Sequence, residues 1–221
     1  MYLASWSGGK DSCFACYQVI KSGQRVVGLL NCISKEHQRV SFHGIDPALI
    51  QAQSRLIDIP LLQKGTTAEY YEREFKEGVR ELSNGQIITG MVFGDIYLDE
   101  HLRWVEGVCN DLGIKALEPL WAKNTSDLLT DFISAGFRAV VISGQASCID
   151  REWLGRPLDG QFVQYLKTRP DVDPCGEKGE YHTLVVSGPL FKGRIEITES
   201  EVVEKEGHRF LDIKEFVVRQ Y

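Results

Sequence analysis

The sequence predicts an α/β protein, in which a parallel β-sheet with helices on both faces is followed by a smaller α+β part. Two near-continuous apolar runs, Arg25–Asn31 and Ile87–Phe93, are typical of strands that are covered on both faces. Segments with helical spacing of apolar residues alternate with these runs, which indicates β–α–β units and a parallel sheet. Beyond residue 120 the pattern changes to short alternating segments that look like β-hairpins.

The first elements follow one another in a β–α order. The first strand is expected at Tyr2–Trp6. The helix that follows, Cys13–Lys21, ends at Gly23, because glycine is the common residue just beyond a helix. Next come the strand Arg25–Asn31 and a helix over Pro47–Leu56, where the proline occupies the first turn.

The same order continues to residue 113. We expect a short strand at Leu61–Leu62 and a helix over residues 68–82, because apolar residues recur there at helical spacing. After the strand Ile87–Phe93, the amphipathic helix Glu100–Leu112 ends at Gly113. Ligands of such sheets bind at the carboxyl ends of the strands, near the point where the strand order reverses.

The second part of the chain has a different pattern of expected helices and strands. We place the boundary at residue 120, so that residues 1–120 form the part with the parallel sheet and residues 121–221 the smaller α+β part. The expected helices are Ser126–Ala135 and Arg156–Thr168, and the loop 169–179 is rich in Pro, Asp and Gly. The expected strands are Ala139–Ile142, Thr183–Val186, Arg194–Thr198, Glu201–Lys205 and Ile213–Val218.

The bulk composition bounds the class of protein. The chain has 221 residues, 43% hydrophobic and 25% charged, which is ordinary for a soluble globular protein of one large or two small domains. A net charge of -6 argues against a nucleic-acid partner, because phosphate contacts need clustered Lys and Arg. No signal peptide and no membrane-spanning run is recognised, so we expect a cytoplasmic protein. The hairpin-like tail could serve as a homodimer surface.

Six cysteines do not imply disulfide bonds in a reducing compartment. Cys13 and Cys16 have the spacing of a redox or metal motif, but a second pair that would complete a zinc site is absent. The favoured interpretation is two small residues on the buried side of a helix. We therefore assign no metal-ligating residues to the chain.

The turn after the first strand carries the strongest functional pattern. Residues 7–12, here called the glycine loop, read Ser-Gly-Gly-Lys-Asp-Ser. A turn that leads into a helix presents free backbone N–H groups and the positive end of the helix dipole, which suits phosphate or pyrophosphate. The loop matches neither the G-x-x-x-x-G-K-[ST] nor the G-x-G-x-x-G pattern.

The glycine loop resembles the S-G-G-x-D-S pyrophosphate loop of the N-type ATP pyrophosphatases, also called adenine nucleotide alpha hydrolases. Within that superfamily the chain is similar to the diphthine–ammonia ligase family over nearly its whole length. The similar stretches are residues 42–43, 94–114 (GDIYLDEHLRWVEGVCNDLGI), 118–121 (EPLW) and 153–191, including WLGRPLD and DPCGEKGEYHTLVVSGPLF. The resemblance implies a Rossmann-like, HUP-type sheet, cleavage of ATP between the alpha and beta phosphates, and transfer of AMP to an acceptor.

The acceptor half departs from the ligase pattern. After Gly94 the family pattern is closer to G-A-I-x-S-x-Y-Q-x-x-R, whereas Asp95 and the run 99–101 (DEH) stand here, and Arg103 keeps a nearby basic position. The family's G-E-G-G-E-x-E-T is replaced by GEKGEYHT at residues 176–183. The nucleotide half thus matches better than the acceptor half, and a sister group with a different acceptor stays open.

The resemblance assigns roles to the glycine loop. Pyrophosphate would bind to backbone amides and serine hydroxyls, and Lys10 would offset its charge. Asp11 could orient the loop or help to hold the Mg²⁺ that arrives with ATP; capping the helix is an equal alternative. The expected nucleotide-binding residues are Ser7, Gly8, Gly9, Lys10, Asp11, Ser12 and Asn31.

Further polar residues are candidates for the chemistry of the acceptor. The expected reaction is attack of a carboxylate on the alpha phosphorus, loss of pyrophosphate, and attack of ammonia or an amine on the acyl-adenylate. Glutamates and a histidine could bind an amine, accept its proton or hold a metal. The catalytic candidates are Lys10, Asp11, Asp95, Glu177 and Glu180, and the substrate-binding candidates are His43, Arg103, Glu177, Glu180 and His182.

Two other classes of function stay open. A sulfur-transfer or tRNA-modifying pyrophosphatase would need a persulfide-carrying cysteine pair in the site, and usually a basic face. A non-enzymatic ATP-binding protein would keep the loop but lack AMP-forming chemistry. The acceptor could be a protein side chain such as diphthine, or a small metabolite.

Overall fold

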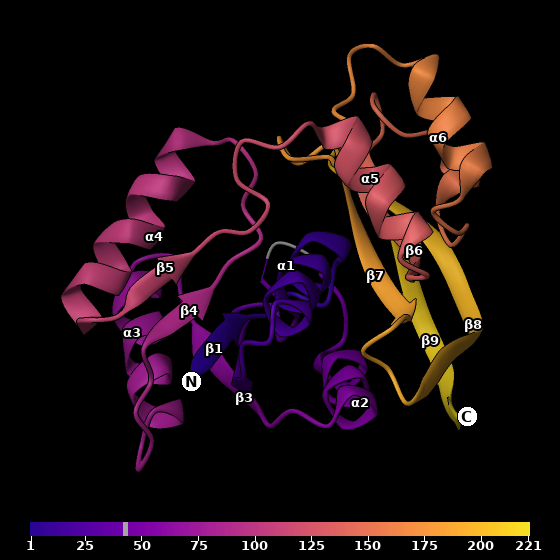
Figure 1. Ribbon diagram of the computed structural model, residues 1–221. Coiled ribbons are helices and arrows are strands. Elements are labelled where there is room, and N and C mark those ends of the chain that lie inside the picture. The colour runs from indigo at the N-terminus through magenta and orange to yellow at the C-terminus, as the bar shows by residue number, and fades with distance from the viewer. Residues whose placement is uncertain (42–43) are drawn as a thin grey trace.

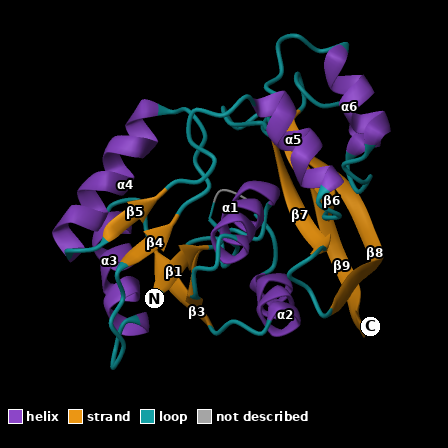
Figure 2. Cartoon of the chain, in the orientation of Figure 1, coloured by secondary structure: helices purple, strands orange, loops and turns teal. Residues whose placement is uncertain are grey.

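Five strands form the parallel sheet in the first half of the computed structural model, which describes residues 1–41 and 44–221. Their order is β3–β2–β1–β4–β5, so the order reverses at β1 (Figures 1 and 2). The strands are β1 (Tyr2–Ser5), β2 (Val26–Ser34), β3 (Leu61–Thr66), β4 (Gly90–Val92) and β5 (Lys115–Leu117). This confirms the predicted Rossmann-like α/β fold.

Helices cover both faces of this sheet. Successive strand residues point to opposite faces, and Leu3 and Ala4 of β1 accordingly lie in two separate apolar clusters. The cluster with Ala4 includes residues of α1 and α2, and the cluster with Leu3 includes residues of α3 and α4. The helices are α1 (Lys10–Lys21), α2 (Pro47–Ile57), α3 (Tyr71–Leu82) and α4 (Asp99–Leu112). None of the helices in the described residues is long and apolar enough to cross a membrane.

The second half contains an antiparallel sheet in the order β7–β6–β9–β8, as the predicted α+β part requires. Its strands are β6 (Arg138–Gln145), β7 (Tyr181–Ser187), β8 (Gly193–Lys205) and β9 (His208–Gln220). Helices α5 (Thr125–Ser134) and α6 (Gly160–Lys167) and the 3₁₀ turn η1 (Arg151–Trp153) accompany it.

Besides shifts in the bounds of several elements, three larger differences separate the prediction from the structure. The segments 194–198 and 201–205 are one strand, because an irregular register between Ile197 and Ser200 bends β8 without ending its pairing. The strand β5 was not predicted, since it has only three residues and stands at the edge of the sheet. The helix expected over 156–168 is confined to α6, because Pro157 instead bridges Val140 of β6.

The two sheets share one apolar core. Phe14 of α1 packs edge-on against Phe132 and Phe137 of the second half, with ring centroids 5.9 and 6.1 Å away. The amide of Val185 in β7 donates to the carbonyl of Gly8 at 2.9 Å, which joins the second sheet to the glycine loop. Contacts of this kind fix the second half directly above the loop.

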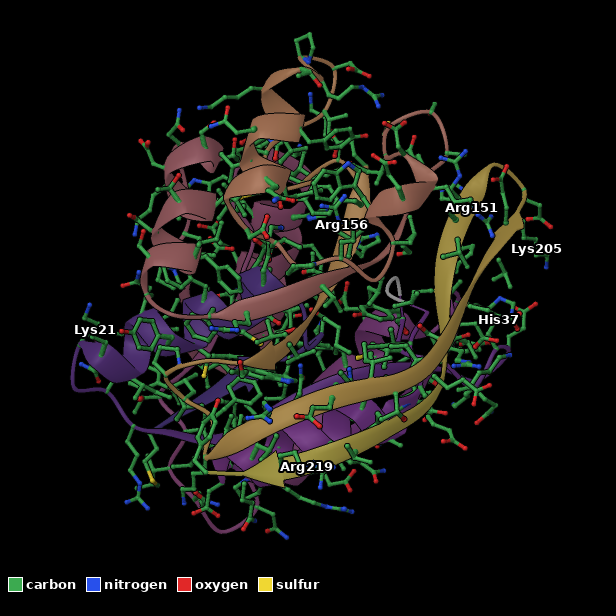
Figure 3. All side chains as sticks on the ribbon, turned by 90° about the vertical axis from the view of Figure 1, so that its right-hand side faces the viewer. Lys21, His37, Arg151, Arg156, Lys205 and Arg219 are labelled. Atoms are coloured by element: carbon green, nitrogen blue, oxygen red, sulfur yellow. The ribbon has the colours of Figure 1, made fainter. Side chains whose placement is uncertain are left out.

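The β8–β9 hairpin forms one edge of the antiparallel sheet. Figure 3 shows it as a long curved ribbon, with Lys205 near its tip. Lys192, just before β8, pairs with Asp58 after α2 at 2.6 Å, and Asp212 of β9 pairs with Arg39 at 3.7 Å. The hairpin therefore contacts the first half at two points.

Candidate active site

A cavity of 830 Å³ lies at the carboxyl ends of β1, β2 and β4, where the strand order reverses. The second half closes one side of it with residues 175–179 and the start of β7. The polar residues in its lining include Ser7, Lys10, Asp11, Ser12, Asn31, Asp95, Glu100, His101, Glu177, Lys178, His182 and Thr183. Aromatic side chains of α3 and α4, such as Tyr71 and Trp104, form the apolar wall.

The glycine loop joins β1 to the first turn of α1. The Ser7 and Ser12 hydroxyl oxygens lie 3.1 Å apart, and the Ser12 hydroxyl also donates to the carbonyl of Gly9 at 3.2 Å. Gly9 stands at the N-cap of α1 without a side-chain cap, so the helix dipole and two hydroxyl groups point toward the same space. This geometry suits an anion.

Gly8 is required by packing as well as by backbone conformation. Its φ is +80°, and a Cβ atom there would lie 2.3 Å from Ile50 and 2.6 Å from Gln53 of α2. Gln53 is fully buried; its amide nitrogen donates to the Gly8 carbonyl at 2.9 Å and its oxygen accepts from the indole of Trp6. The sequence analysis did not identify Gln53, whose role arises only when α2 meets the loop.

Lys10 is buried and held from both halves of the chain. Its ammonium donates to Asp11 at 2.8 Å and to the carbonyl of Cys175, and its backbone amide donates to the Thr183 hydroxyl at 3.0 Å. Burial is the largest influence and acts to lower the pKa of Lys10, but Asp11, Tyr181 and Cys175 together outweigh it and hold the pKa above its ordinary value. Lys10 is therefore a fixed positive charge, and Thr183 and Cys175 are contacts that the sequence analysis missed.

Asp95, His101 and Glu177 come together from three segments. Asp95 follows β4, His101 lies in the first turns of α4, and Glu177 comes from the loop before β7. One oxygen or nitrogen of each lies within 4.8 Å of the other two, and His101 Nδ1 is 2.9 Å from Asp95. The hydrogen bond to Asp95 raises the pKa of His101, and burial, with Asp11 and Asp95 adding to it, raises the pKa of Glu177 to about 7.

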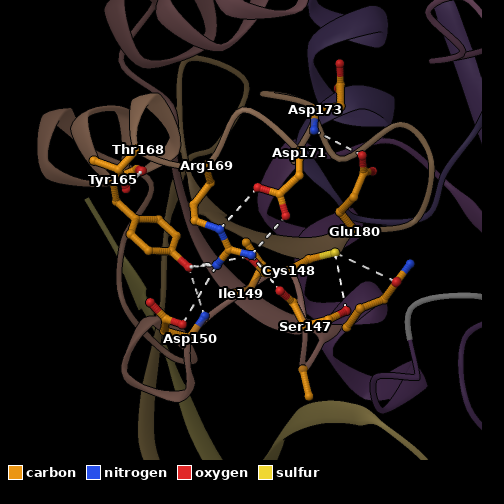
Figure 4. A network of polar contacts seen from close by, with 12 residues as sticks. Ser147, Cys148, Ile149, Asp150, Tyr165, Thr168, Arg169, Asp171, Asp173 and Glu180 are labelled. Atoms are coloured by element: carbon orange, nitrogen blue, oxygen red, sulfur yellow. Dashed lines mark hydrogen bonds and ion pairs between the residues drawn. The ribbon is translucent and has the colours of Figure 1, made fainter.

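Glu180 shapes the loop of residues 173–180, here called the acidic loop. Its carboxylate accepts the backbone N–H groups of Asp173 at 3.0 Å and Lys178 at 2.9 Å, and Figure 4 shows the first of these bonds. Glu180 is 5% exposed and is not among the described residues that line the cavity. The geometry therefore favours a role in holding the loop rather than contact with a substrate.

His182 lines the cavity beside Thr183 on β7. Burial, together with the charges of Lys10 and His208, lowers the pKa of His182 to about 4. Its imidazole is therefore neutral at pH 7 and adds no positive charge next to Lys10.

The remaining expected residues have different surroundings. Asn31 lines the cavity but is 1% exposed, and its amide donates to the carbonyl of Trp6. Arg103 is exposed and donates to the Asp99 carbonyl at 3.1 Å, on the side of α4 away from the described cavity lining. His43 lies outside the described residues.

The cysteine pair of the sulfur-transfer alternative is buried. Cys13 and Cys16 are both 0% exposed, on the side of α1 that faces the core. Burial raises the pKa of both thiols, that of Cys16 to about 12, which opposes formation of a thiolate. This arrangement matches the structural interpretation of the pair.

Comparison with known families covers both halves of the chain. The model of the diphthamide synthase N-terminal domain matches residues 2–116, and that of the diphthamide synthase C-terminal domain matches residues 124–218. The chain is 31% identical to a diphthine–ammonia ligase of Bos taurus over 94% of this chain and 86% of the relative, and 30% identical to that of Homo sapiens over 89% and 82%.

A third relative, the diphthine–ammonia ligase of Schizosaccharomyces pombe, is 32% identical over 90% of this chain. The match covers only 36% of that longer protein. The N-terminal model alone spans more than half of the chain, and the Bos taurus relative is matched over most of its own length. The chain therefore belongs to the diphthamide synthase family.

Proposed function

We propose that this chain is an ATP-dependent ligase that adenylates a carboxylate and then joins ammonia to it, with diphthine as the acceptor. The relatives named diphthine–ammonia ligase support the substrates. The observation that carries the chemistry is the buried, charged Lys10 at the amino end of α1, in a cavity at the switch point of a parallel sheet.

The first step is adenylation. An oxygen of the acceptor carboxylate attacks the alpha phosphorus of ATP, and pyrophosphate leaves. Ser7, Ser12 and the amino end of α1 bind the departing pyrophosphate, and Lys10 offsets its charge. Asp11 is 32% exposed and lines the cavity, so it can contact the Mg²⁺ that accompanies ATP while it orients Lys10.

The second step is amidation. Ammonia attacks the acyl carbon, and AMP leaves with the electron pair of the broken C–O bond. The carboxylates of Asp95 and Glu177 line the cavity, where one of them can accept the proton that ammonium loses before it attacks, and the nitrogen releases its second excess proton to solvent as the amide forms. Neutral His182 does not repel the ammonium ion.

The organisation around this chemistry follows the sequence analysis. We propose that residues 1–120 bind the nucleotide and residues 121–221 bind the acceptor, in a cytoplasmic protein that could form a homodimer through its hairpin. Two alternatives are less well supported: sulfur transfer lacks an accessible cysteine pair in the site, and a pure ATP sensor leaves Asp95 and Glu177 without a role.

Phosphorus NMR tests the proposal directly. The chain is incubated with MgATP, ammonium chloride and a diphthine-bearing protein, and AMP and pyrophosphate should appear together, while mass spectrometry shows the acceptor lose one Da as its hydroxyl is replaced by an amino group. Lys10→Ala should abolish both signals, and Lys21→Ala, at the other end of α1, should leave them unchanged. ADP and phosphate instead, or ATP that binds without cleavage, would contradict the proposal.

A further inference from the structure

The group formed by Asp95, His101 and Glu177 has the composition of a metal site. Two carboxylates and one imidazole supply oxygen and nitrogen donors, and one donor atom of each lies within 4.8 Å of the other two. Mixed donors of this type suit first-row transition ions such as Mn²⁺ and Zn²⁺, whereas Mg²⁺ prefers oxygen donors alone.

The surrounding contacts hold these three side chains in place. Glu177 accepts the backbone N–H of Ile96 through Oε1 at 2.8 Å, which fixes it next to the segment that carries Asp95. Asp95 and His101 share a hydrogen bond of 2.9 Å. A cation can take the place of the shared proton with side-chain rotations alone, because all three residues line the open cavity.

A further carboxyl group, that of Glu118, lies near the cluster. Oε1 of Glu118 is buried and has no hydrogen-bond partner among the described residues, and this carboxyl is close enough to Asp95 for their charges to interact. Of the two lysines in the described cavity lining, Lys10 is bound to Asp11 and to a backbone carbonyl, and Lys178 is exposed. Asp95 thus has two further carboxyl groups, those of Glu118 and Glu177, close enough for their charges to interact, and such an environment favours a bound cation.

We propose that Asp95, His101 and Glu177 form a divalent-cation site of the chain itself, selective for Mn²⁺ or Zn²⁺ over Mg²⁺ and separate from the cation that accompanies ATP. Because its ligands come from the β4–α4 loop, from α4 and from the acidic loop, the ion would connect the two halves of the chain. Three protein ligands also leave coordination positions open toward the cavity. This site differs from the expectation that the chain holds no metal.

The test measures binding without nucleotide, so it does not depend on the proposed reaction. The full chain is stripped with a chelator, the chelator is removed, and binding of Mn²⁺ is followed by electron paramagnetic resonance of the free ion. One Mn²⁺ should bind per chain, and Zn²⁺ should displace it more readily than an equal concentration of Mg²⁺. Saturation should raise the melting temperature, because the ion binds only the folded chain.

The variants His101→Ala and Glu177→Gln should each weaken Mn²⁺ binding by at least about tenfold. His37→Ala and Asp99→Asn are matched controls, since both residues are exposed and neither lines the described cavity, and they should bind as the parent chain does. Circular dichroism verifies that each variant folds. Unchanged binding in both cluster variants, absence of binding to the folded parent chain, or equal affinity for Mg²⁺ would overturn the proposal.

Discussion

The two loops that face each other across the cavity are built in different ways. The glycine loop is local: six consecutive residues and the helix behind them supply the hydroxyls, the positive helix end and Lys10. The acidic loop depends on contacts across several residues, because Glu180 accepts two backbone N–H groups and Asp173 accepts those of Cys175 and Glu177. Each loop also contacts the other through Lys10 and the Cys175 carbonyl.

Because of this difference, the two loops should tolerate substitutions to different degrees. The glycine loop packs tightly against α2, whereas a Cβ atom at Gly179 in the acidic loop would meet nothing within 4 Å. The glycine loop is fixed by packing at Gly8, whereas the acidic loop combines close packing at Gly176 with carboxylate hydrogen bonds and has open space at Gly179. Substitutions on the two sides should consequently differ in kind and in size.

The largest effect is expected for Gly8→Ala. The new Cβ atom would overlap Ile50 and Gln53 at a backbone φ of +80°, so the free energy of unfolding should fall by about 4 kcal/mol. Urea denaturation measures it. Gly179→Ala has a similar φ of +79° in open space and should cost about 1 kcal/mol. Equal losses in the two variants would refute the packing difference.

The second prediction compares two lysines that line the cavity. Lys10→Met should lower the rate of AMP formation about 1,000-fold, because it removes the fixed charge next to the phosphates. The free energy of unfolding should also fall, by about 2 to 3 kcal/mol, because the variant leaves the partly buried Asp11 carboxylate without its cation and the Cys175 carbonyl without its donor; the rate is therefore compared at a temperature at which circular dichroism shows both variants folded. Lys178→Met, on the exposed edge of the acidic loop, should change the rate only a few-fold. A comparable loss of rate in both variants would show that the positive charge of Lys10 does not depend on its position in the glycine loop.

The third prediction concerns the dependence of stability on pH. The folded-state pKa of His182 is about 4 and its unfolded value is about 6.5, so protonation favours the unfolded chain. The stability that neutral His182 contributes is fully present above about pH 6.5 and should fall as the pH drops toward 4, by about 3 kcal/mol, because each unit of pKa difference corresponds to about 1.4 kcal/mol. The difference between the parent chain and His182→Asn, followed by urea denaturation from pH 7 to pH 4, isolates the contribution. If the free energies of unfolding of the two proteins changed in parallel over this pH range, the prediction would be contradicted.

The smallest of these effects is expected for Glu180→Gln. The amide can accept only one of the two backbone N–H groups well and carries no charge, so unfolding should become easier by about 1 to 2 kcal/mol. The substrate KM should rise more than kcat falls, because the acidic loop would be less ordered. Glu204→Gln in the hairpin, an exposed carboxylate, is the matched control. A loss of kcat as large as that of Lys10→Met would instead make Glu180 a catalytic residue.

The sequence predicted the first half of the fold well because its signals are local. Apolar runs and helical spacing report burial within a few residues, and they placed four of the five parallel strands and their helices. The same patterns could not show that residues 194–205 form one bent strand, since polar Glu199 and Ser200 resemble a turn. The register of β8 is set by its pairing with β9.

The direction in which a side chain points decided which of the predicted site residues line the cavity. Arg103 and His101 are two residues apart on α4, about 200° around the helix axis, so only His101 lines the cavity. Glu177 and Glu180 are three residues apart in the acidic loop, and only Glu177 lines the cavity. Neither distinction can be drawn from residue type.

By itself, the sequence determined a parallel sheet and a glycine loop suited to phosphate, because both depend on short-range conformation and on the amphipathic pattern. The tertiary structure alone decided that Cys175 and Thr183 contact Lys10, that Gln53 holds Gly8, and that Asp95, His101 and Glu177 meet. These partners are separated by up to 173 residues, and only the shared core between the two sheets brings them together.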